Sequence, residues 1–302
     1  MKILTLILLL TIASITGCQQ TKEGVMVEVN GIEVTQSEFD RDFEIVIQSL
    51  IRERGEDALS QIGFDGRTVE DSEREALLEG LIVKKLIVED AKSRGITVAE
   101  TELKSAEDAF ISDVGDESAF QDFLSDRGID MDYFEDYINY SLISEKHRED
   151  VISETEITES DLRKYFDDNL ESLIEVRASH ILLGNEEDAL AIINRLENGE
   201  KFEDIALLES LDSESAIRGG DLGYFSRGFY SIIEFEDSAF TLPVGEVSGV
   251  VKTEVGYHVI RVDDRLDSFE DLKDKAEQKM KDEIYYEYVK NLVNNAEIKR
   301  YI

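Results

Sequence analysis

Apolar residues in the first half of the chain recur mostly with the spacing of amphipathic helices. The segment 25–34 is an exception, because two apolar-rich runs flank Asn30-Gly31, a pair that favours a β-hairpin turn. The next residues, 35–38 (TQSE), have the spacing of a helix capping box and predict the start of a helix. The periodicity predicts further helices over 72–94, 99–112, 116–126, 130–149 and 158–169. The first half is therefore predicted to be mainly helical.

The pattern changes at Glu175. The run 175–183 (EVRASHILL) is typical of a strand, and 186–197 predicts a helix. Glycine-rich sequence with short strands continues to Val262, after which 268–295 predicts one long amphipathic helix and 296–302 a closing strand. We therefore expect an α+β fold in which an α+β domain is inserted into a mainly helical domain. The expected divisions are a leader at 1–17, a helical region at 18–171, the insert at 172–265 and a returning helix at 266–302.

The N-terminus has the composition of an export signal. Lys2 precedes an apolar run that is too short to span a bilayer as a stable helix, and small residues follow it. Cys18, the single cysteine of the chain, comes directly after this leader. That position resembles the lipobox of bacterial lipoproteins, where the cysteine is lipidated and anchors the mature chain. The alternative is a cysteine that ends an apolar leader by chance.

The charge balance narrows the class of partner. The chain of 302 residues has 69 acidic against 32 basic residues, a net charge of -37. Such a chain repels phosphate backbones, so nucleic acid is not expected as a partner. One cysteine excludes an internal disulfide, and three histidines make a dedicated zinc site improbable. The acidity itself has two interpretations: a solvated acidic surface, or a cradle for basic polypeptides or cations.

Several sequence blocks follow one another in the order found in the parvulin family of peptidyl-prolyl isomerases. They are 177–182 (RASHIL), 215–216 (SA), 219–225 (GGDLGYF), 226–228 (SRG), 235–240 (FEDSAF), 242–248 (LPVGEVS) and 253–260 (TEVGYHVI). The resemblance implies an α+β domain with a central antiparallel sheet and an enzyme that isomerises X-Pro bonds. The helical flanks resemble, more loosely, those of the extracytoplasmic foldases PrsA and SurA.

The resemblance also implies a set of site residues. His180 and His258 would face each other at the centre of the site, joined by hydrogen bonds, with Thr253 near the second histidine. Leu222, Tyr230 and Phe235 align with the family's proline-binding cup, where Tyr230 replaces a common methionine. The family places Cys or Asp beside the twisting amide. Counting along this sequence gives Ser213 for that position, with Asp212 directly before it, and both remain candidates.

The reaction itself requires no cofactor or metal, because amide rotation breaks no covalent bond. The helical region shows no catalytic constellation. His147, within 145–149 (EKHRE), is expected on a solvated helix face. Aromatic residues recur in two helices and predict either helix packing or a groove for unfolded chains: Tyr133, Phe134, Tyr137, Tyr140, Tyr285, Tyr286 and Tyr288.

These features give one main hypothesis for function and two alternatives. The main one is a lipid-anchored isomerase of the bacterial cell envelope, outside the cytoplasm, that helps unfolded exported polypeptides to fold. It would lie on an outer membrane facing the periplasm or on the outer face of the cytoplasmic membrane. The first alternative is a holdase chaperone whose parvulin-like domain binds peptide with little turnover. The second is an acidic lipoprotein that buffers cations.

Overall fold

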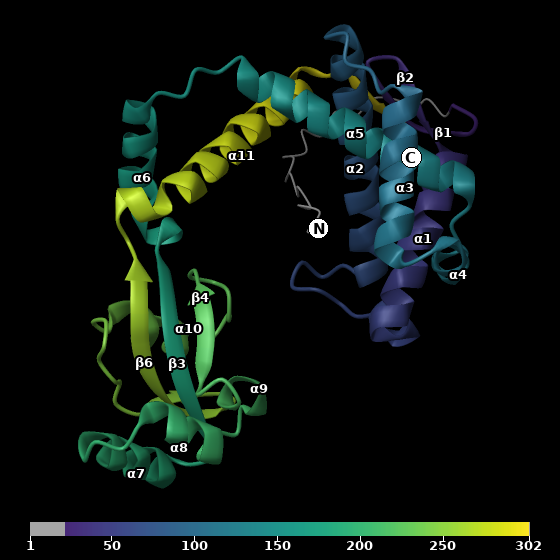
Figure 1. The fold of residues 1–302 in the computed structure, drawn as a ribbon. Helices are drawn as coiled ribbons and strands as arrows, with labels where there is room; N and C mark the ends of the chain where they lie inside the picture. The colour runs from purple at the N-terminus through teal and green to yellow at the C-terminus, as the bar shows by residue number, and fades with distance from the viewer. Residues whose placement is uncertain (1–21, 302) are drawn as a thin grey trace. The chain divides into compact units, whose positions relative to one another are not determined.

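Residues 22–301 are described by the computed structural model and fall into two units (Figure 1). The first unit consists of residues 22–156 and 283–301, and the second of Ile157–Asp282. The predicted leader and Cys18 lie outside the described residues. Among residues 22–301, no helix has both the length and the apolar composition needed to cross a membrane.

The first unit is built mainly from helices, as expected. Its elements are β1 (Val25–Val29), β2 (Ile32–Thr35), α1 (Gln36–Arg54), the 3₁₀ turn η1 (Glu56–Ala58), α2 (Val69–Ser93), α3 (Glu100–Val114), α4 (Glu117–Arg127), α5 (Met131–Ser153), the second half of α11 (Phe269–Asn295) and β7 (Ile298–Arg300). The predicted helices of this region are therefore confirmed, with ends shifted by a few residues.

A small antiparallel sheet joins strands from near the two ends of the described residues. β1 pairs with β2 across Asn30-Gly31, whose φ angles are 49° and 84°. Asn tolerates this left-handed conformation and Gly adopts it freely, so this pair suits the turn. The other edge of β1 pairs antiparallel with β7. The predicted hairpin and closing strand are both confirmed.

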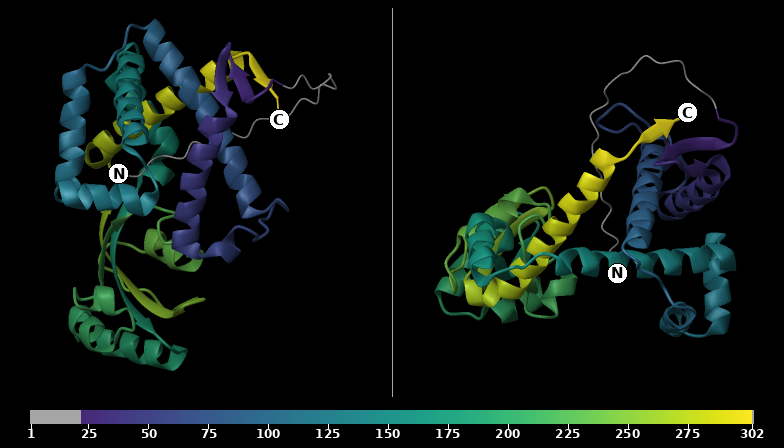
Figure 2. Two further views of the ribbon diagram at one scale, coloured as in Figure 1. Left: turned by 90° about the vertical axis from the view of Figure 1, so that its right-hand side faces the viewer. Right: turned by 90° about the horizontal axis from the view of Figure 1, so that it is seen from above.

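The helices of this unit bury one apolar core against the sheet. Thr35 caps α1 by accepting a hydrogen bond from the backbone N–H of Glu38, at 3.1 Å. Phe39 on α1 and Ile82 on α2 are fully buried in a cluster that also includes Val293 of α11. The second half of the returning helix thus contributes to the core of the first unit. This helix is drawn in yellow in Figure 2.

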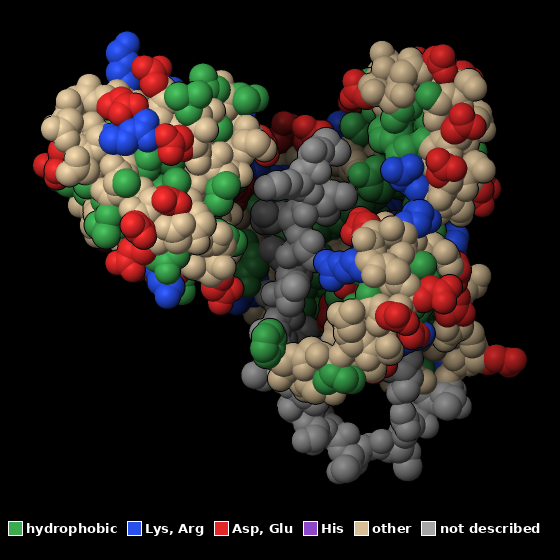
Figure 3. Space-filling view, turned by 90° about the horizontal axis from the view of Figure 1, so that it is seen from below, with side chains coloured by type: hydrophobic (Ala, Val, Ile, Leu, Met, Phe, Trp, Pro, Cys, Tyr) green, Lys and Arg blue, Asp and Glu red, His purple; other side chains and the backbone are tan. Residues whose placement is uncertain are grey.

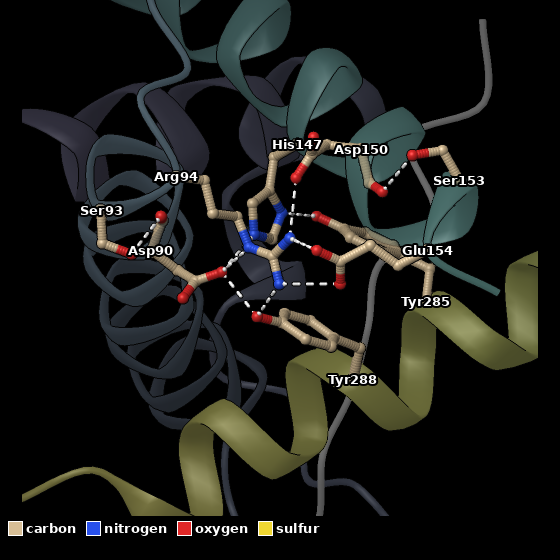
Figure 4. A network of polar contacts seen from close by, with 9 residues as sticks. All are labelled: Asp90, Ser93, Arg94, His147, Asp150, Ser153, Glu154, Tyr285 and Tyr288. Carbon is tan, nitrogen blue, oxygen red and sulfur yellow. Dashed lines mark hydrogen bonds and ion pairs between the residues drawn. The ribbon is translucent and has the colours of Figure 1, made fainter.

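The prediction for His147 is wrong. Its side chain is 0% exposed and lies between α2 and α11, not on a solvated face. Nε2 is 2.9 Å from Asp90 Oδ2, and Nδ1 is 3.0 Å from the hydroxyl of Tyr285 (Figure 4). The charged neighbours in the sequence suggested exposure, but α2 and α11 cover the face of α5 that carries the imidazole. That burial results from tertiary packing and leaves no local pattern.

Aromatic residues of α5 and α11 also occupy packing positions. Phe134 is buried, and its ring contacts those of Phe110 and Phe120 at centroid distances of 5.0 and 4.8 Å. Tyr285 and Tyr288 lie edge-on to the buried His147 ring. These contacts support the helix-packing interpretation for the three predicted residues involved.

The second unit surrounds a four-stranded antiparallel sheet in the order β4-β3-β6-β5. Its elements are α6 (Glu159–Leu173), β3 (Glu175–Leu183), α7 (Glu186–Glu197), α8 (Phe202–Glu209), α9 (Ser213–Ala216), β4 (Asp221–Phe225), α10 (Ile233–Thr241), β5 (Val251–Thr253), β6 (Gly256–Leu266) and the first half of α11. The predicted strand at 175–183 and helix at 186–197 are confirmed.

Alternate residues of the long central strands face opposite layers. Val176 and Ala178 of β3 are buried with Phe235 and Phe240 of α10. Ile181 and Leu183, on the other face, pack instead with α7 and α8. Burial on both faces explains the consecutive apolar residues 181–183 at the end of the strand.

The second unit extends beyond the expected insert at both ends. α6 and the first half of α11 pack together, with Phe166 and Leu173 buried against Leu272 and Ala276. The expected fold class, an α+β domain with a central antiparallel sheet inserted in a mainly helical one, is confirmed. The limits 172–265 for the inserted domain remain a prediction.

Candidate active site

His180 and His258 lie on one face of the sheet, the face that α10 covers. In the β3–β6 register His180 is opposite Ile260, and His258 is opposite Leu182. Because residues two apart on a strand share a face, the two histidines are diagonal neighbours. Both are buried, and their Nδ1 atoms are 3.1 Å apart. The predicted pairing of the two imidazoles is present in the structure.

A chain of hydrogen bonds runs through both rings from Thr253 to Asp212. His180 Nε2 is 2.7 Å from Asp212 Oδ2, and His258 Nε2 is 2.9 Å from Thr253 Oγ1. One assignment of tautomers fits the three contacts along this chain: Thr253 donates to His258, His258 Nδ1 donates to His180 Nδ1, and His180 Nε2 donates to Asp212. Both imidazoles are neutral in this assignment.

The structure brings Asp212, and not Ser213, to the histidines. Asp212 is the N-cap of α9, where Oδ1 accepts from the N–H of Glu214 and Oδ2 from the hydroxyl of Ser215. Ser213 is the exposed first residue of α9. Partial burial opposes ionisation, but the hydrogen bonds from Ser215 and His180 outweigh it and lower the pKa of Asp212. An ionised carboxylate therefore ends the hydrogen-bonded chain.

Ser215 is a site residue that the sequence analysis did not identify. It is 1% exposed, and its hydroxyl donates to the same oxygen of Asp212 that contacts His180. The signal was available, because a serine three residues after an N-cap aspartate is placed to return a hydrogen bond to it.

Gly220 lets the chain after α9 approach β3 beside His180. Its carbonyl accepts a hydrogen bond from the N–H of His180 at 2.9 Å. Gly220 has a φ of +88°, and a Cβ there would be 2.5 Å from the carbonyl oxygen of His180. Glycine is therefore required by both the backbone conformation and the close approach.

An apolar surface lies against the histidine pair. The ring of Phe235 is buried, with its centroid 5.7 Å from that of His180 and 5.4 Å from that of His258. Tyr230 lies edge-on to Phe235 at 5.5 Å, and Leu222 packs against the same cluster. The three residues aligned with the proline cup thus gather on the side of the sheet that carries the histidines.

We expect the chain to lose stability between pH 6.5 and 4 because of His258. Burial, assisted by the neighbouring His180, lowers the pKa of His258 from 6.5 to about 4. In that window the unfolded chain binds a proton that the folded chain does not. The free energy of unfolding therefore falls as the pH is lowered from 6.5 to 4, by a total of about 3 kcal/mol, and is not reduced by His258 above pH 6.5.

Urea unfolding of the wild type and of His258→Asn at pH 7, 5.5 and 4 measures this difference. The wild type should lose more free energy of unfolding than the variant on acidification. Parallel losses in the two proteins would contradict the assignment, whatever the variant costs at pH 7.

Two family models match most of the chain. Residues 161–266 match the model of the PPIC-type PPIase domain, and residues 1–148 match that of the SurA-like N-terminal domain. The chain is 35% identical to the foldase protein PrsA of Halalkalibacterium halodurans over 234 residues, which are 73% of this chain and 69% of that protein. The chain belongs to the PrsA foldase family. It is therefore a peptidyl-prolyl cis-trans isomerase with a parvulin domain.

Two further PrsA proteins are similar to this chain. The PrsA of Caldanaerobacter subterraneus is 29% identical over 299 residues, which cover 95% of this chain and 92% of that one. The crystal structure of the peptidylprolyl isomerase PrsA from Bacillus anthracis is 26% identical, with a TM-score of 0.39, and covers 72% of this chain and 96% of that chain.

Proposed function

We propose that this PrsA-family chain is a lipid-anchored foldase that isomerises X-Pro bonds of exported proteins outside the cytoplasm. The observation that supports it most is the Asp212–His180–His258–Thr253 chain lying against an apolar cup. Family membership supports the isomerase chemistry, and the relatives bear the name foldase. Unfolded exported polypeptides are the proposed partners.

The proposed mechanism lowers the barrier to rotation without covalent chemistry. Rotation about an X-Pro amide costs about 18–20 kcal/mol, because resonance is lost in the twisted state. A site accelerates it by binding the twisted amide more tightly than the planar one. The apolar cup holds the proline ring away from water, and the adjacent polar chain supplies a fixed electrostatic environment for the peptide group.

We assign the residues distinct roles within this site. Leu222, Tyr230 and Phe235 hold the proline ring. His180 and His258, braced by Thr253, form the floor and fix the orientation of the polar groups. Asp212 places a carboxylate at the end of that chain, where the amide twists.

A refolding assay tests the proposed function. The chain from Gln19 should accelerate the slow, proline-limited folding phase of an exported protein, and it should accelerate isomerisation of a short X-Pro peptide. His180→Ala should lose both effects together. Acceleration of folding that survives in a folded His180→Ala protein would contradict the proposal that this site performs the foldase function.

Membrane attachment is proposed through Cys18, and we expect Cys18→Ser to abolish it. In cells grown with a radiolabelled fatty acid, the wild type should carry label and fractionate with membranes. Cys18→Ser should carry none and fractionate with soluble protein, because one thiol is the proposed acyl acceptor. Gln19→Ser is the matched control and should behave as the wild type. A membrane-bound Cys18→Ser chain would contradict the proposed anchor.

The second candidate function is a holdase, and exposed apolar residues of the first unit favour it. Ile62 and Phe64, in the segment before α2, are 66% and 117% exposed. On the face drawn in Figure 3, apolar side chains stand among acidic ones at several separate places. Such a surface suits weak binding to unfolded, basic chains.

Deletion of the insert separates the two functions. Glu175 pairs with Leu266 in the sheet, so the ends of segment 172–265 are near each other and a short linker can replace it. Binding of an unfolded client that survives this deletion, and weakens in Phe64→Ser, would support the holdase. Loss of binding with the insert would favour the isomerase site as the main contact.

A further inference from the structure

The loop that carries Tyr230 has little regular structure of its own. Residues 226–232 connect β4 to α10. Within the loop Gly228 has a φ of 84°, and Ser231 has a φ of 55°, which non-glycine residues adopt infrequently. A backbone in such conformations persists where surrounding contacts fix it. The position of Tyr230 therefore depends on groups outside the loop.

Glu236, on the first turns of α10, supplies the central contacts. Its side chain is buried, with the residue 6% exposed. One carboxylate oxygen accepts the N–H of Gly228 at 2.7 Å, and the other accepts the N–H of Tyr230 at 3.0 Å. A buried carboxylate is costly unless it is hydrogen-bonded, and bonds to an ionised acceptor are stronger than neutral ones. The two oxygens therefore hold the middle of the loop.

The first residues of the loop are held by other side chains. Lys275 on α11 donates to the hydroxyl of Ser226 at 2.7 Å. Arg227 pairs with Asp237 at 2.9 Å and lies over the ring of Phe240. These contacts hold the first two residues of the loop. They do not involve Tyr230, whose backbone N–H is held by Glu236.

The fixed backbone places the Tyr230 ring in the cup. The ring lies edge-on to Phe225 at 4.9 Å and to Phe235 at 5.5 Å. Phe235 in turn contacts both site histidines. Glu236 directly follows Phe235 on α10, so one short stretch of helix supplies a cup residue and also holds the backbone of another.

We propose that Glu236 is a positioning residue of the isomerase, whose carboxylate holds Tyr230 as a wall of the proline cup. The inference rests on the proposed assignment of Tyr230 to that cup. Glu236 acts through Tyr230 and touches no substrate. Because the wall contacts the proline ring in the planar and the twisted states alike, its loss weakens binding more than turnover.

Kinetics of Glu236→Gln on an X-Pro peptide test this role. The amide keeps the size of the side chain but accepts through one oxygen and turns an NH₂ group toward a donor. We expect KM to rise about tenfold, with kcat changed less than about twofold, because the lost contacts involve a charged acceptor. Glu234→Gln is the matched control, since Glu234 is exposed on the same helix. It should match the wild type.

A double-mutant cycle separates positioning from general damage. If Glu236 acts through Tyr230, then Glu236→Gln should raise KM in the wild-type background and have no further effect in Tyr230→Ala. Equal effects of Glu236→Gln in both backgrounds would overturn the proposal. If Tyr230→Ala itself leaves KM unchanged, the assignment of Tyr230 to the cup fails instead, and the two failures are thereby distinguished.

Amide hydrogen exchange tests the two hydrogen bonds of Glu236 in the wild-type chain, so the result does not depend on whether a variant folds. In the wild-type chain the N–H groups of Gly228 and Tyr230 should exchange with deuterium at least about tenfold more slowly than unprotected amides, since each has a buried acceptor. Exchange of both at the unprotected rate would overturn the proposal.

Discussion

Asp212→Ala is expected to lower kcat/KM for a short X-Pro peptide about 100-fold, whereas Ser213→Ala should change it less than about twofold. Asp212 ends the hydrogen-bonded chain through His180, and its carboxylate is held by Ser215 as well. Removing it leaves His180 Nε2–H without its acceptor and removes the fixed negative charge of the site. Ser213 is exposed, and the side chain that caps the N-terminus of α9 is that of Asp212.

A protease-free assay of cis-trans exchange, followed by NMR, measures both variants with the chain from Gln19. Asp212→Asn is the matched comparison, because asparagine keeps the shape of the side chain and one acceptor oxygen but removes the negative charge. Activity of Asp212→Asn close to that of Asp212→Ala would identify the charge as the important property. If Ser213→Ala loses activity while Asp212→Ala keeps it, the proposed assignment of the acid is wrong.

The pairing of His180 with His258 was expected from the resemblance to parvulins, and the strand register of the structure gives its physical basis. The motif around His180 and the one around His258 each read as strands, and antiparallel pairing of the two places the rings on one face. The choice between Asp212 and Ser213 was not predictable. It depends on the turn that makes Asp212 the cap of a helix and leaves Ser213 exposed.

The buried polar residues that support the site or the core were missed for a related reason. Ser215 and Glu236 were visible as parts of motifs. The partner of Ser215 is the local capping residue Asp212, but the partners of Glu236 are backbone N–H groups whose positions depend on how the loop before α10 folds. His147 was misjudged because its sequence neighbours are charged, and nothing in the local pattern indicates that two other helices cover it. Sequence periodicity locates an apolar face well and a buried polar residue poorly.

The His147 cluster joins three helices of the first unit around a single carboxylate oxygen. Asp90 Oδ2 lies within hydrogen-bond distance of His147 Nε2 (2.9 Å), Arg94 Nε (2.7 Å) and the hydroxyl of Tyr288 (2.7 Å), as Figure 4 shows. Burial opposes ionisation of Asp90, but the bonds from Tyr288, His147 and Arg94 together lower its pKa. Burial raises the pKa of Tyr285 to about 12, so its hydroxyl remains protonated beside His147.

His147→Ala is therefore expected to destabilise the first unit by about 3 kcal/mol. The change opens a cavity at a fully buried position and removes one hydrogen bond from each of Asp90 and Tyr285. Urea unfolding at pH 7, followed by far-ultraviolet circular dichroism, measures the loss. Lys146→Ala is the matched control on the same helix, where the part-exposed Lys146–Glu102 pair should contribute less than about 1 kcal/mol.

The same variant separates stability from catalysis. Because the Asp212–His180–His258–Thr253 chain lies wholly in the second unit, we expect His147→Ala to isomerise short peptides within about twofold of the wild-type rate under conditions where it is folded. If the first unit binds unfolded polypeptides, His147→Ala should weaken that binding as it destabilises the unit. Equal unfolding free energies for His147→Ala and Lys146→Ala would show that the cluster contributes nothing beyond an exposed ion pair, and the stabilising role argued for His147 would be wrong.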